Sequence, residues 1–294
     1  MAASPYAVLR RFNRAWTQRV GVLDESFLGS GRPLGLARLL FEIGPDGAGV
    51  LTLRQRLGLD SGYLSRLLRQ LADDGLVEVV PDPGDGRRRL ATLTGRGLEE
   101  WQSLEDRSER LARDLVAPLS QSQRARLDEA LATAELLVRA ATLDLEPVAA
   151  SAPEAVAAVR SYFDELDERF PGGFDPGDAW THDAAAFSPP EGIFVVARDE
   201  DRVVGCGAVQ RLAPGTAEIK RMWVHPSLRG AGLGSRLLRH LEGEAAALGY
   251  ATVRLDTNDS LAEAIAMYER AGYRRIERYN DNPHAEAFFE KPLV

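Results

Sequence analysis

Hydrophobic residues recur at the spacing of an α-helix through the first half of the chain. Residues 5–43 carry two such stripes with a break between them, which predicts two helices. A short helix with Thr52 at its N-cap ends at Gly58, and a longer helix, capped by Asp60 or Ser61, follows at once. The pattern therefore predicts a helix–turn–helix unit.

The pattern of hydrophobic residues changes directly after this unit. A run of β-forming residues, the turn segment PDPGDG and a second extended run fill residues 76–93, so we expect a hairpin. Thr94 can cap a further helix, and Ser120 with Gln123 has the spacing of a capping box for a helix that reaches about Ala140. Helices therefore close the first half of the chain.

From residue 146 onward, extended runs and turns alternate. After a helix over residues 153–168, the runs at 193–198, 202–212 and 217–224 predict three consecutive antiparallel strands. A helix, a strand, a second helix and two final strands complete the chain. This order predicts an α+β domain with a mixed, mostly antiparallel central sheet.

Length and composition fit two ordinary globular domains. The chain has 294 residues, of which 45% are hydrophobic and 27% charged. Domains of about 150 residues are typical, and we place them at residues 1–143 and 144–294. No apolar run approaches the roughly 18 residues of a membrane span, and the first residues lack the pattern of a secretory signal. We therefore expect a cytoplasmic protein without a membrane partner.

The charge is distributed unevenly between the two halves. The formal net charge is -8, yet residues 1–145 carry 20 basic and 20 acidic residues, so the whole surplus lies in residues 146–294. The acidic total therefore does not argue against nucleic-acid binding by the first half. Cys206 is the single cysteine, and the four histidines are far apart in the sequence, so we expect no metal site.

The second helix of the helix–turn–helix unit has the composition of a DNA-recognition helix. Leucines at core spacing alternate with polar residues that could reach DNA. The candidate DNA contacts are Ser61, Gly62, Tyr63, Ser65, Arg66 and Arg69. Hydroxyls near a helix start suit phosphate, and either arginine could address a guanine edge or the backbone.

The hairpin that follows carries three successive arginines, Arg87, Arg88 and Arg89. A helix for the major groove with a charged hairpin beside it, for phosphate or the minor groove, is the pattern of a winged helix. The alternative is a helical dimerisation or scaffolding domain whose arginines only keep a turn solvated.

At these residues the chain resembles the MarR family of transcriptional regulators, over roughly residues 1–143. Asp85-x-Arg87 is similar to the wing-tip pattern of that family. The resemblance implies a homodimer formed through the terminal helices. It also implies binding to a pseudo-palindromic double-stranded DNA operator, with release by a small molecule in some members.

A glycine-rich segment, RGAGLG, lies between a predicted strand and an amphipathic helix. Its residues are Arg229, Gly230, Ala231, Gly232, Leu233 and Gly234. Glycines at such a turn let backbone N–H groups approach a pyrophosphate, and the helix N-terminus adds a favourable dipole. A Rossmann loop is the alternative, but the preceding strands form an antiparallel meander and no βαβ unit follows.

This loop, with AEIKRMWVHP before it and LDTNDSLAEAIAMYERAGY after it, resembles the GNAT N-acetyltransferase superfamily over about residues 146–294. The resemblance implies acetyl-CoA as co-substrate. By that resemblance the backbone of Met222, Trp223 and Val224 would pair with pantetheine. The loop amides through Ser235 would hold the pyrophosphate, and Asn258 would touch the cofactor. Tyr268 would lie near the thioester sulfur.

The chemistry of acetyl transfer assigns roles to two residues. An alkyl amine has a pKa near 10.4 and must lose a proton before it attacks a thioester. Glu218, on the strand before the loop, is the predicted base, and Tyr268 is the predicted acid for the thiolate. The alternatives are a surface carboxylate and a packing tyrosine. Cys206 lies in an apolar strand, where a core role is expected.

The acceptor is left open by the sequence. Residues 161–178 occupy the place where members of that superfamily bind it. Arg169 could pair with a substrate carboxylate, and His182 and His284 could border the pocket. We expect a DNA-binding regulator fused to an acetyl-CoA-dependent N-acetyltransferase for a small primary amine. The alternative is a transcription factor whose second domain senses acetyl-CoA or a metabolite without turnover.

Overall fold

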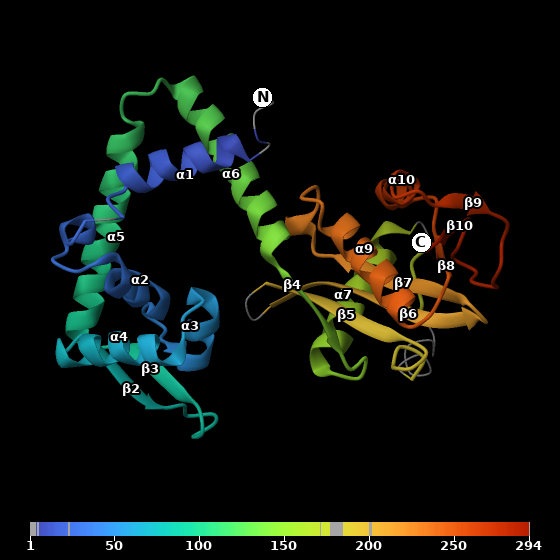
Figure 1. Ribbon diagram of the computed structural model, residues 1–294, viewed down its shortest axis with the longest axis horizontal. Helices are drawn as coiled ribbons and strands as arrows, with labels where there is room; N and C mark the ends of the chain where they lie inside the picture. The colour runs from blue at the N-terminus through green and yellow to red at the C-terminus, as the bar shows by residue number, and fades with distance from the viewer. Residues whose placement is uncertain are drawn as a thin grey trace. The chain divides into compact units, whose positions relative to one another are not determined.

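The structure is a computed structural model (Figure 1) that describes residues 4, 6–22, 24–170, 172–176, 185–199 and 202–293. These residues form two compact units, Met1–Leu127 and Asp128–Val294. Each unit has its own hydrophobic core. Within the described ranges, no helix is long and apolar enough to cross a membrane.

The first unit is mainly helical, as predicted. Its helices are α1 (Ala7–Arg19), α2 (Leu34–Ile43), α3 (Val50–Leu57), α4 (Ser61–Asp73) and α5 (Gly95–Val116), with a short 3-10 turn at Phe27–Gly29. The helix–turn–helix unit consists of α3 and α4. Gly58 closes α3 in the left-handed region, and the Asp60 carboxylate accepts a hydrogen bond from the Tyr63 amide at 2.9 Å. This N-cap satisfies one of the orphan donors of α4.

A three-stranded sheet follows α4 in the order β1-β3-β2. β2 (Val77–Pro81) and β3 (Arg89–Leu93) form the predicted hairpin, and β1 (Ala48–Gly49) pairs with β3. The pairing of β1 places the N-cap of α3 at Gly49, so the prediction of Thr52 at that N-cap was wrong. Two residues are too few to show a strand period.

The long helix α6 (Gln121–Thr142) crosses the boundary between the units. Its start is the predicted capping box: the Ser120 amide donates to Gln123 Oε1 at 2.9 Å, and the Gln123 amide donates to Ser120 Oγ at 3.3 Å. Near its end, Ala140 and Leu143 are buried in one cluster with Leu228 and Leu233. The last turns of α6 therefore belong to the core of the second unit, and the domain boundary at 143/144 stays a prediction.

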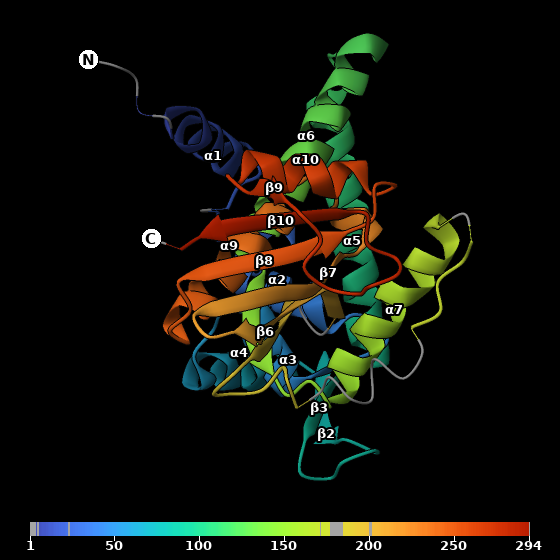
Figure 2. The ribbon, with the colours of Figure 1, turned by 90° about the vertical axis from the view of Figure 1, so that its right-hand side faces the viewer.

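The second unit contains a seven-stranded sheet in the order β4-β5-β6-β7-β8-β10-β9 (Figure 2). The strands are β4 (Asp144–Val148), β5 (Ile193–Asp199), β6 (Arg202–Ala213), β7 (Thr216–Val224), β8 (Thr252–Thr257), β9 (Arg274–Ile276) and β10 (Ala287–Pro292). β7 and β8 are parallel, and the other neighbours pair antiparallel. The mixed, mostly antiparallel sheet is confirmed. β4 was not predicted, because Pro147 is unusual in a strand except at an edge.

Helices cover both faces of this sheet. They are α7 (Pro153–Arg169), α9 (Leu233–Ala247) and α10 (Ala262–Arg270), with a 3-10 turn at Pro226–Leu228. Val195 and Val209 are buried with the leucines of α9, whereas Phe194 and Cys206 are buried with the alanines of α7. Neighbouring strand residues point to opposite faces, so α7 and α9 pack on opposite sides of β5 and β6.

Replacing Leu143 by alanine should destabilise the second unit by about 2–4 kcal/mol, because it leaves a cavity beside Leu228 and Leu233. Urea unfolding followed by hydrogen exchange should show earlier exposure of the β7–α9 peptides, with the α2–α4 peptides unchanged. Leu137→Ala is the matched control, since Leu137 is 48% exposed on the same helix. Equal effects of the two substitutions would contradict the placement of α6 in this core.

Candidate active site and DNA-binding surface

The central opening of the second unit lies between the two parallel strands. The ladder between β7 and β8 covers only Thr216–Glu218 and Thr252–Arg254, whereas the strands run on to Val224 and Thr257. Past Glu218 the strands separate, while each keeps its other neighbour. The edge of β7 that faces the gap therefore presents backbone groups for an extended ligand.

A β-bulge in β7 lies at this opening. Cys206 pairs with Trp223 and Ala208 pairs with Lys220, so Arg221 and Met222 together oppose Gly207. Arg221 has φ +58°, which is rare outside glycine. Gly207 has no room for a side chain, because a Cβ there would lie 2.5 Å from Leu241 of α9. The bulge is therefore held in place by the packing of α9.

The glycine-rich loop has the geometry that was predicted for it. Gly230 and Gly232 have φ of +76° and +83°, and α9 begins at Leu233 directly after them. The first N–H groups of a helix lack partners inside it and favour an anion. A Cβ on Gly234 would lie 3.2 Å from Met267 Sδ, so this glycine also permits close approach of α10.

A cavity of about 530 Å³ extends along this loop and the free edge of β7. Its lining includes the predicted residues Met222, Trp223, Val224, Arg229, Gly230, Gly232, Leu233, Gly234 and Ser235. Ala231 packs instead against the cluster that contains Leu228. Most of the residues predicted to hold an acyl-CoA thus surround one space, whereas Asn258 lines the second cavity, and the roles of all of them stay predictions.

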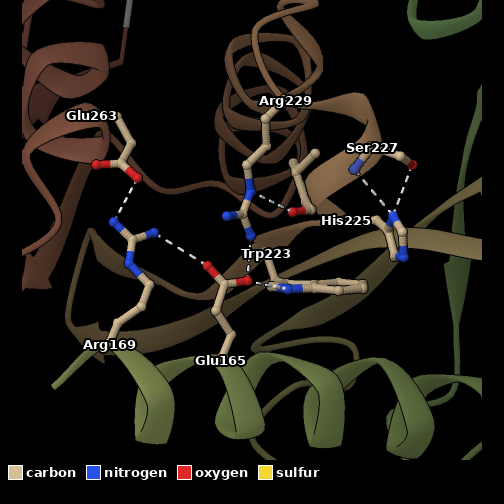
Figure 3. Close-up of polar contacts among 8 residues, drawn as sticks. Glu165, Arg169, Trp223, His225, Ser227, Arg229 and Glu263 are labelled. Carbon is tan, nitrogen blue, oxygen red and sulfur yellow. Dashed lines mark hydrogen bonds and ion pairs between the residues drawn. The ribbon is translucent and has the colours of Figure 1, made fainter.

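A chain of charged groups crosses one wall of this cavity (Figure 3). Glu165 on α7 accepts hydrogen bonds from Trp223 Nε1 at 2.9 Å and from Arg229, and its other oxygen accepts from Arg169 at 3.2 Å. Arg169 also donates to Glu263 on α10 at 2.5 Å. The carboxylates beside Arg169 raise the pKa of its guanidinium against the opposing effect of burial. These contacts tie α7, β7 and α10 together around the cavity.

Arg229, the first residue of the signature, is exposed but held by two contacts to the protein. Its Nε donates to the Val224 carbonyl at 3.0 Å, in addition to its ion pair with Glu165. This side chain therefore fixes the loop against β7 and α7, and leaves the following backbone amides to meet a ligand. His225 supports the same turn through its Nδ1, which lies 2.8 Å from Ser227 Oγ.

A second cavity, of about 360 Å³, adjoins the first. The two share lining residues at their junction, namely Tyr162, Leu166, Met222, Leu261 and Ala264. The predicted residues Asn258 and Tyr268 line this second cavity, together with His284. Asn258 donates to the His284 carbonyl at 2.9 Å. His182 lies outside the described residues.

Glu218 does not line either cavity. Its side chain is buried and accepts hydrogen bonds from Gln210 at 2.8 Å, from Tyr279 at 2.8 Å and from Asn280 at 3.1 Å. It also forms an ion pair with Lys220 at 3.2 Å. The carboxylate is therefore satisfied within the protein, behind the cavity.

Two carboxylates line the second cavity: the exposed Asp175 after α7 and Asp256 on β8, of which Asp256 is the neighbour of Glu218. It shares both Lys220, at 3.6 Å, and Asn280, at 2.7 Å, with Glu218, and it accepts a third contact from Asn282 at 3.1 Å. Asp256 and Lys220 line this second cavity, although the Asp256 side chain is only 8% exposed. The sequence held a signal for Lys220, which lies two residues from Glu218 on β7, the spacing of one face. Asp256 lies two residues before Asn258, which follows the end of β8.

Two buried tyrosines lie beside Asp256. Burial raises the pKa of Tyr162 to about 12, with Asp256 acting in the same direction and Arg221 against it. Burial likewise raises the pKa of Tyr268, and Tyr162 and Asp256 add to that effect. Both hydroxyls therefore stay protonated at neutral pH and can donate hydrogen bonds.

The predicted DNA-reading residues are all exposed on α4. Ser61, Gly62, Tyr63, Ser65, Arg66 and Arg69 face outward, whereas Leu64, Leu67, Leu68 and Leu71 are buried as their spacing predicted. The Arg66 guanidinium lies 5.5 Å from the centre of the Tyr63 ring. One face of the helix is thus polar and accessible, as a recognition helix requires.

Arg87 and Arg88 are exposed at the tip of the hairpin, where Asp85 organises the turn. Asp85 Oδ1 accepts from the Arg87 amide at 3.1 Å, and its other oxygen lies 3.5 Å from Arg88 Nε. Arg89 instead donates to the Val79 carbonyl at 2.8 Å, which holds its side chain on the hairpin. Two of the three arginines are therefore available at the tip.

In the first unit, the hydrophobic stripe of α1 is exposed. Tyr6, Leu9, Phe12 and Trp16 are between 43% and 68% exposed. Such an apolar helix face is the kind of surface that subunits bury in an obligate dimer. In the described ranges no group of three or more His, Cys, Asp or Glu side chains is arranged to hold a metal ion.

Comparison with known proteins agrees with this geometry. Residues 159–273 match the model of the acetyltransferase (GNAT) family, and residues 37–88 match that of the MarR family. A protein of Azospirillum brasilense named IAA acetyltransferase is 37% identical over 142 residues, which are 46% of this chain and 91% of that protein. An uncharacterized HTH-type transcriptional regulator of Bacillus subtilis is 32% identical over 114 residues, which are 38% of this chain and 68% of that protein.

An uncharacterized N-acetyltransferase of Schizosaccharomyces pombe is 40% identical over 99 residues, which are 33% of this chain and 61% of that protein. The chain therefore combines a winged-helix unit with an acyltransferase fold. It belongs to the MarR family through its first half and to the GNAT acetyltransferase family through its second. Family membership supports the use of an acyl-CoA by the second unit.

Cys206 should be inert in the folded protein. Its thiol is buried and donates to the Arg221 carbonyl at 3.3 Å, and burial raises its pKa to about 12. At pH 8 only about one thiol in 10⁴ would then be ionised. A disulfide reagent should label it only after denaturation, when one thiol per chain appears. Rapid labelling of the native protein would show instead that the β6–β7 core opens readily.

Proposed function

We propose that the protein is a transcriptional regulator and an acetyl-CoA-dependent N-acetyltransferase that acts on the amine of a small molecule. The observation that carries the enzymatic part is the pair of adjoining cavities. One runs along the loop and the free edge of β7, and the other contains Asp256 and Tyr268. This arrangement suits a thioester that lies in the first cavity and an amine that enters from the second.

Acetyl-CoA fits the first cavity by its chemistry. The free edge of β7 offers backbone partners for the amides of pantetheine, and the start of α9 favours the pyrophosphate. The thioester supplies an activated acetyl group at the junction. Met222, Trp223 and Val224 would orient it, and the amides from Gly230 to Ser235 would hold its phosphates.

Asp256 is the group best placed to take the amine proton, with Glu218 behind it. The new N–C bond forms as the C–S bond breaks, and the proton leaves the nitrogen for a carboxylate oxygen. The predicted base, Glu218, would then act through Asp256, because the two carboxylates share Lys220 and Asn280. Tyr268 would donate a hydrogen bond or its proton to the departing sulfur.

The roles of the two carboxylates can be separated by isosteric substitution. Asp256→Asn should lower kcat about 10²-fold and leave the Kd of acetyl-CoA unchanged, whereas Glu218→Gln should lower kcat about tenfold. Thiol release from acetyl-CoA with a panel of primary amines measures both. Glu242→Gln is the control, because its partner Lys291 lies 2.7 Å away and neither lines a cavity.

Two results would change this assignment. A larger loss with Glu218→Gln than with Asp256→Asn would restore Glu218 as the direct base. Saturable binding of acetyl-CoA without thiol release for any amine would favour a sensor domain over an enzyme.

For the first unit, we propose that a homodimer binds double-stranded DNA through α4 and the hairpin. The exposed polar face of α4 and the exposed Arg87 and Arg88 support this proposal. The neutral balance of residues 1–145 means that a few placed arginines, rather than a general positive field, would provide phosphate contacts.

Each of Arg87→Ala and Arg88→Ala should weaken DNA binding uniformly across sequences and reduce the salt slope of log Kd by about 1. Titration of a DNA duplex from the promoter region of the gene that encodes this protein, at several salt concentrations, measures this slope. Arg113→Ala is the control, since Arg113 is 68% exposed on α5 and pairs with Glu109. An unchanged slope in both hairpin variants would remove the hairpin from the interface.

A further inference from the structure

Three aromatic rings line the second cavity, here called the acceptor-side cavity, at its α7 end. Phe170 and Phe174 come from the end of α7 and the segment after it, and His284 comes from the segment between β9 and β10. The ring centres of Phe174 and His284 lie 4.8 Å apart, and those of Phe170 and His284 lie 6.1 Å apart. Phe170 and Phe174 meet edge to face at 80°. The cavity thus has an aromatic wall assembled from two distant segments.

Because these rings are tilted against one another, the cluster presents both ring edges and ring faces. A further ring is favoured there, because aromatic pairs gain energy in tilted and edge-to-face arrangements beyond the burial of area. Leu166, Ile219 and Met222 add apolar lining to the same space. The wall therefore suits a flat, apolar and polarisable group.

The size of the cavity allows a ring and a short chain. Its volume is about 360 Å³, whereas an engineered protein cavity of about 150 Å³ already binds benzene. The remaining space would hold an aminoalkyl arm that reaches the junction with the first cavity. A larger acceptor such as a folded peptide segment would need the space outside.

The charged groups of the cavity indicate how many amino groups the acceptor carries. Asp256 lines it as a nearly buried carboxylate and Asp175 as an exposed one, while Lys220 and Arg221 line it as cations. One amino group can meet Asp256. A chain with several ammonium groups would place positive charges beside Lys220 and Arg221, away from water, which is unfavourable. Asp175 is exposed to water, so Asp256 is the nearly buried carboxylate of this lining, and the charges beside it favour an acceptor with a single amine.

We propose that the acceptor is an aromatic primary amine, an arylalkylamine, whose ring packs against Phe170, Phe174 and His284 and whose nitrogen meets Asp256. This inference rests on the proposed transferase function and names the acceptor class of the same site. The transfer is the one described above: the amine proton goes to the carboxylate, the N–C bond forms, and the sulfur leaves as the thiol of CoA.

The test compares acceptors that differ only in aromaticity. With full-length protein and acetyl-CoA, 2-phenylethylamine should be acetylated with a kcat/KM about tenfold above that of 2-cyclohexylethylamine. The polyamine spermidine should be poorer still, by about 10²-fold. Calorimetric titration of the same amines in the presence of CoA measures the preference without turnover.

Matched variants test whether the aromatic wall causes the preference for the phenyl amine over the cyclohexyl amine. Phe174→Leu keeps apolar volume but removes the ring, so it should raise the KM for 2-phenylethylamine about tenfold and reduce the preference over the cyclohexyl amine. The KM for acetyl-CoA should not change. Tyr250→Leu is the control: it removes a ring of the second unit that lines neither cavity, and it should change the preference less than twofold.

Equal kcat/KM for the phenyl and cyclohexyl amines, or a preference for spermidine, would overturn the aromatic acceptor while leaving the transferase intact. Absence of thiol release with every amine would instead overturn the transferase, and calorimetry would then decide the acceptor class. In that calorimetric experiment, equal or undetectable heats of binding for the phenyl and cyclohexyl amines would refute the aromatic acceptor class.

Discussion

The separation of β7 from β8 is the constraint on which the second unit depends. A parallel pair that ends after three residues leaves two half-sheets joined at one end, and the free backbone of β7 lines the gap. The opening is maintained because β6 holds β7 and β10 holds β8 along their other edges. The bulge at Arg221 and Met222 turns the strand at this point, and the loop after Val224 then delivers the start of α9 to the same gap. The bulge and the loop thus border the same cavity.

Electrostatics then distinguishes the two sides of the groove. Glu165, Arg169, Arg229 and Glu263 neutralise one another around the cofactor side. On the acceptor side, Glu218 and Asp256 share a single lysine and the amide of Asn280. Buried carboxylates persist only when such donors satisfy them. Asp256 lines the cavity and Glu218 does not, so the proposed proton acceptance would be a property of the pair.

The sequence revealed the elements with local signals and missed those that depend on distant partners. Gly58, Thr94 and the Ser120–Gln123 box act within a few residues, so the helices around them were predictable, as was the glycine-rich loop. β1 and β4 are strands only because β3 and β5 pair with them. Glu218 was predicted to lie at the reaction site. Whether a side chain of β7 reaches the gap depends on where β8 separates from β7, and the pairing of the two strands ends at Glu218. Residues 161–178 and His284 were expected at the acceptor pocket, but Asp256 and the packing of the rings on one another were missed, because they join segments about 30 to more than 100 residues apart.

The two walls of the cleft come from differently organised parts of the chain. Most of the cofactor side is one continuous run from Met222 to Ser235, whereas the acceptor side is assembled from the end of α7, the end of β8 and the segment before β10. Substitutions in those three segments can accumulate without touching the loop that is proposed to hold the pyrophosphate. Acceptor choice is therefore free to diverge between related chains while cofactor use is preserved, and changes of specificity are expected to map to Phe170, Phe174 and His284 before any residue of the loop.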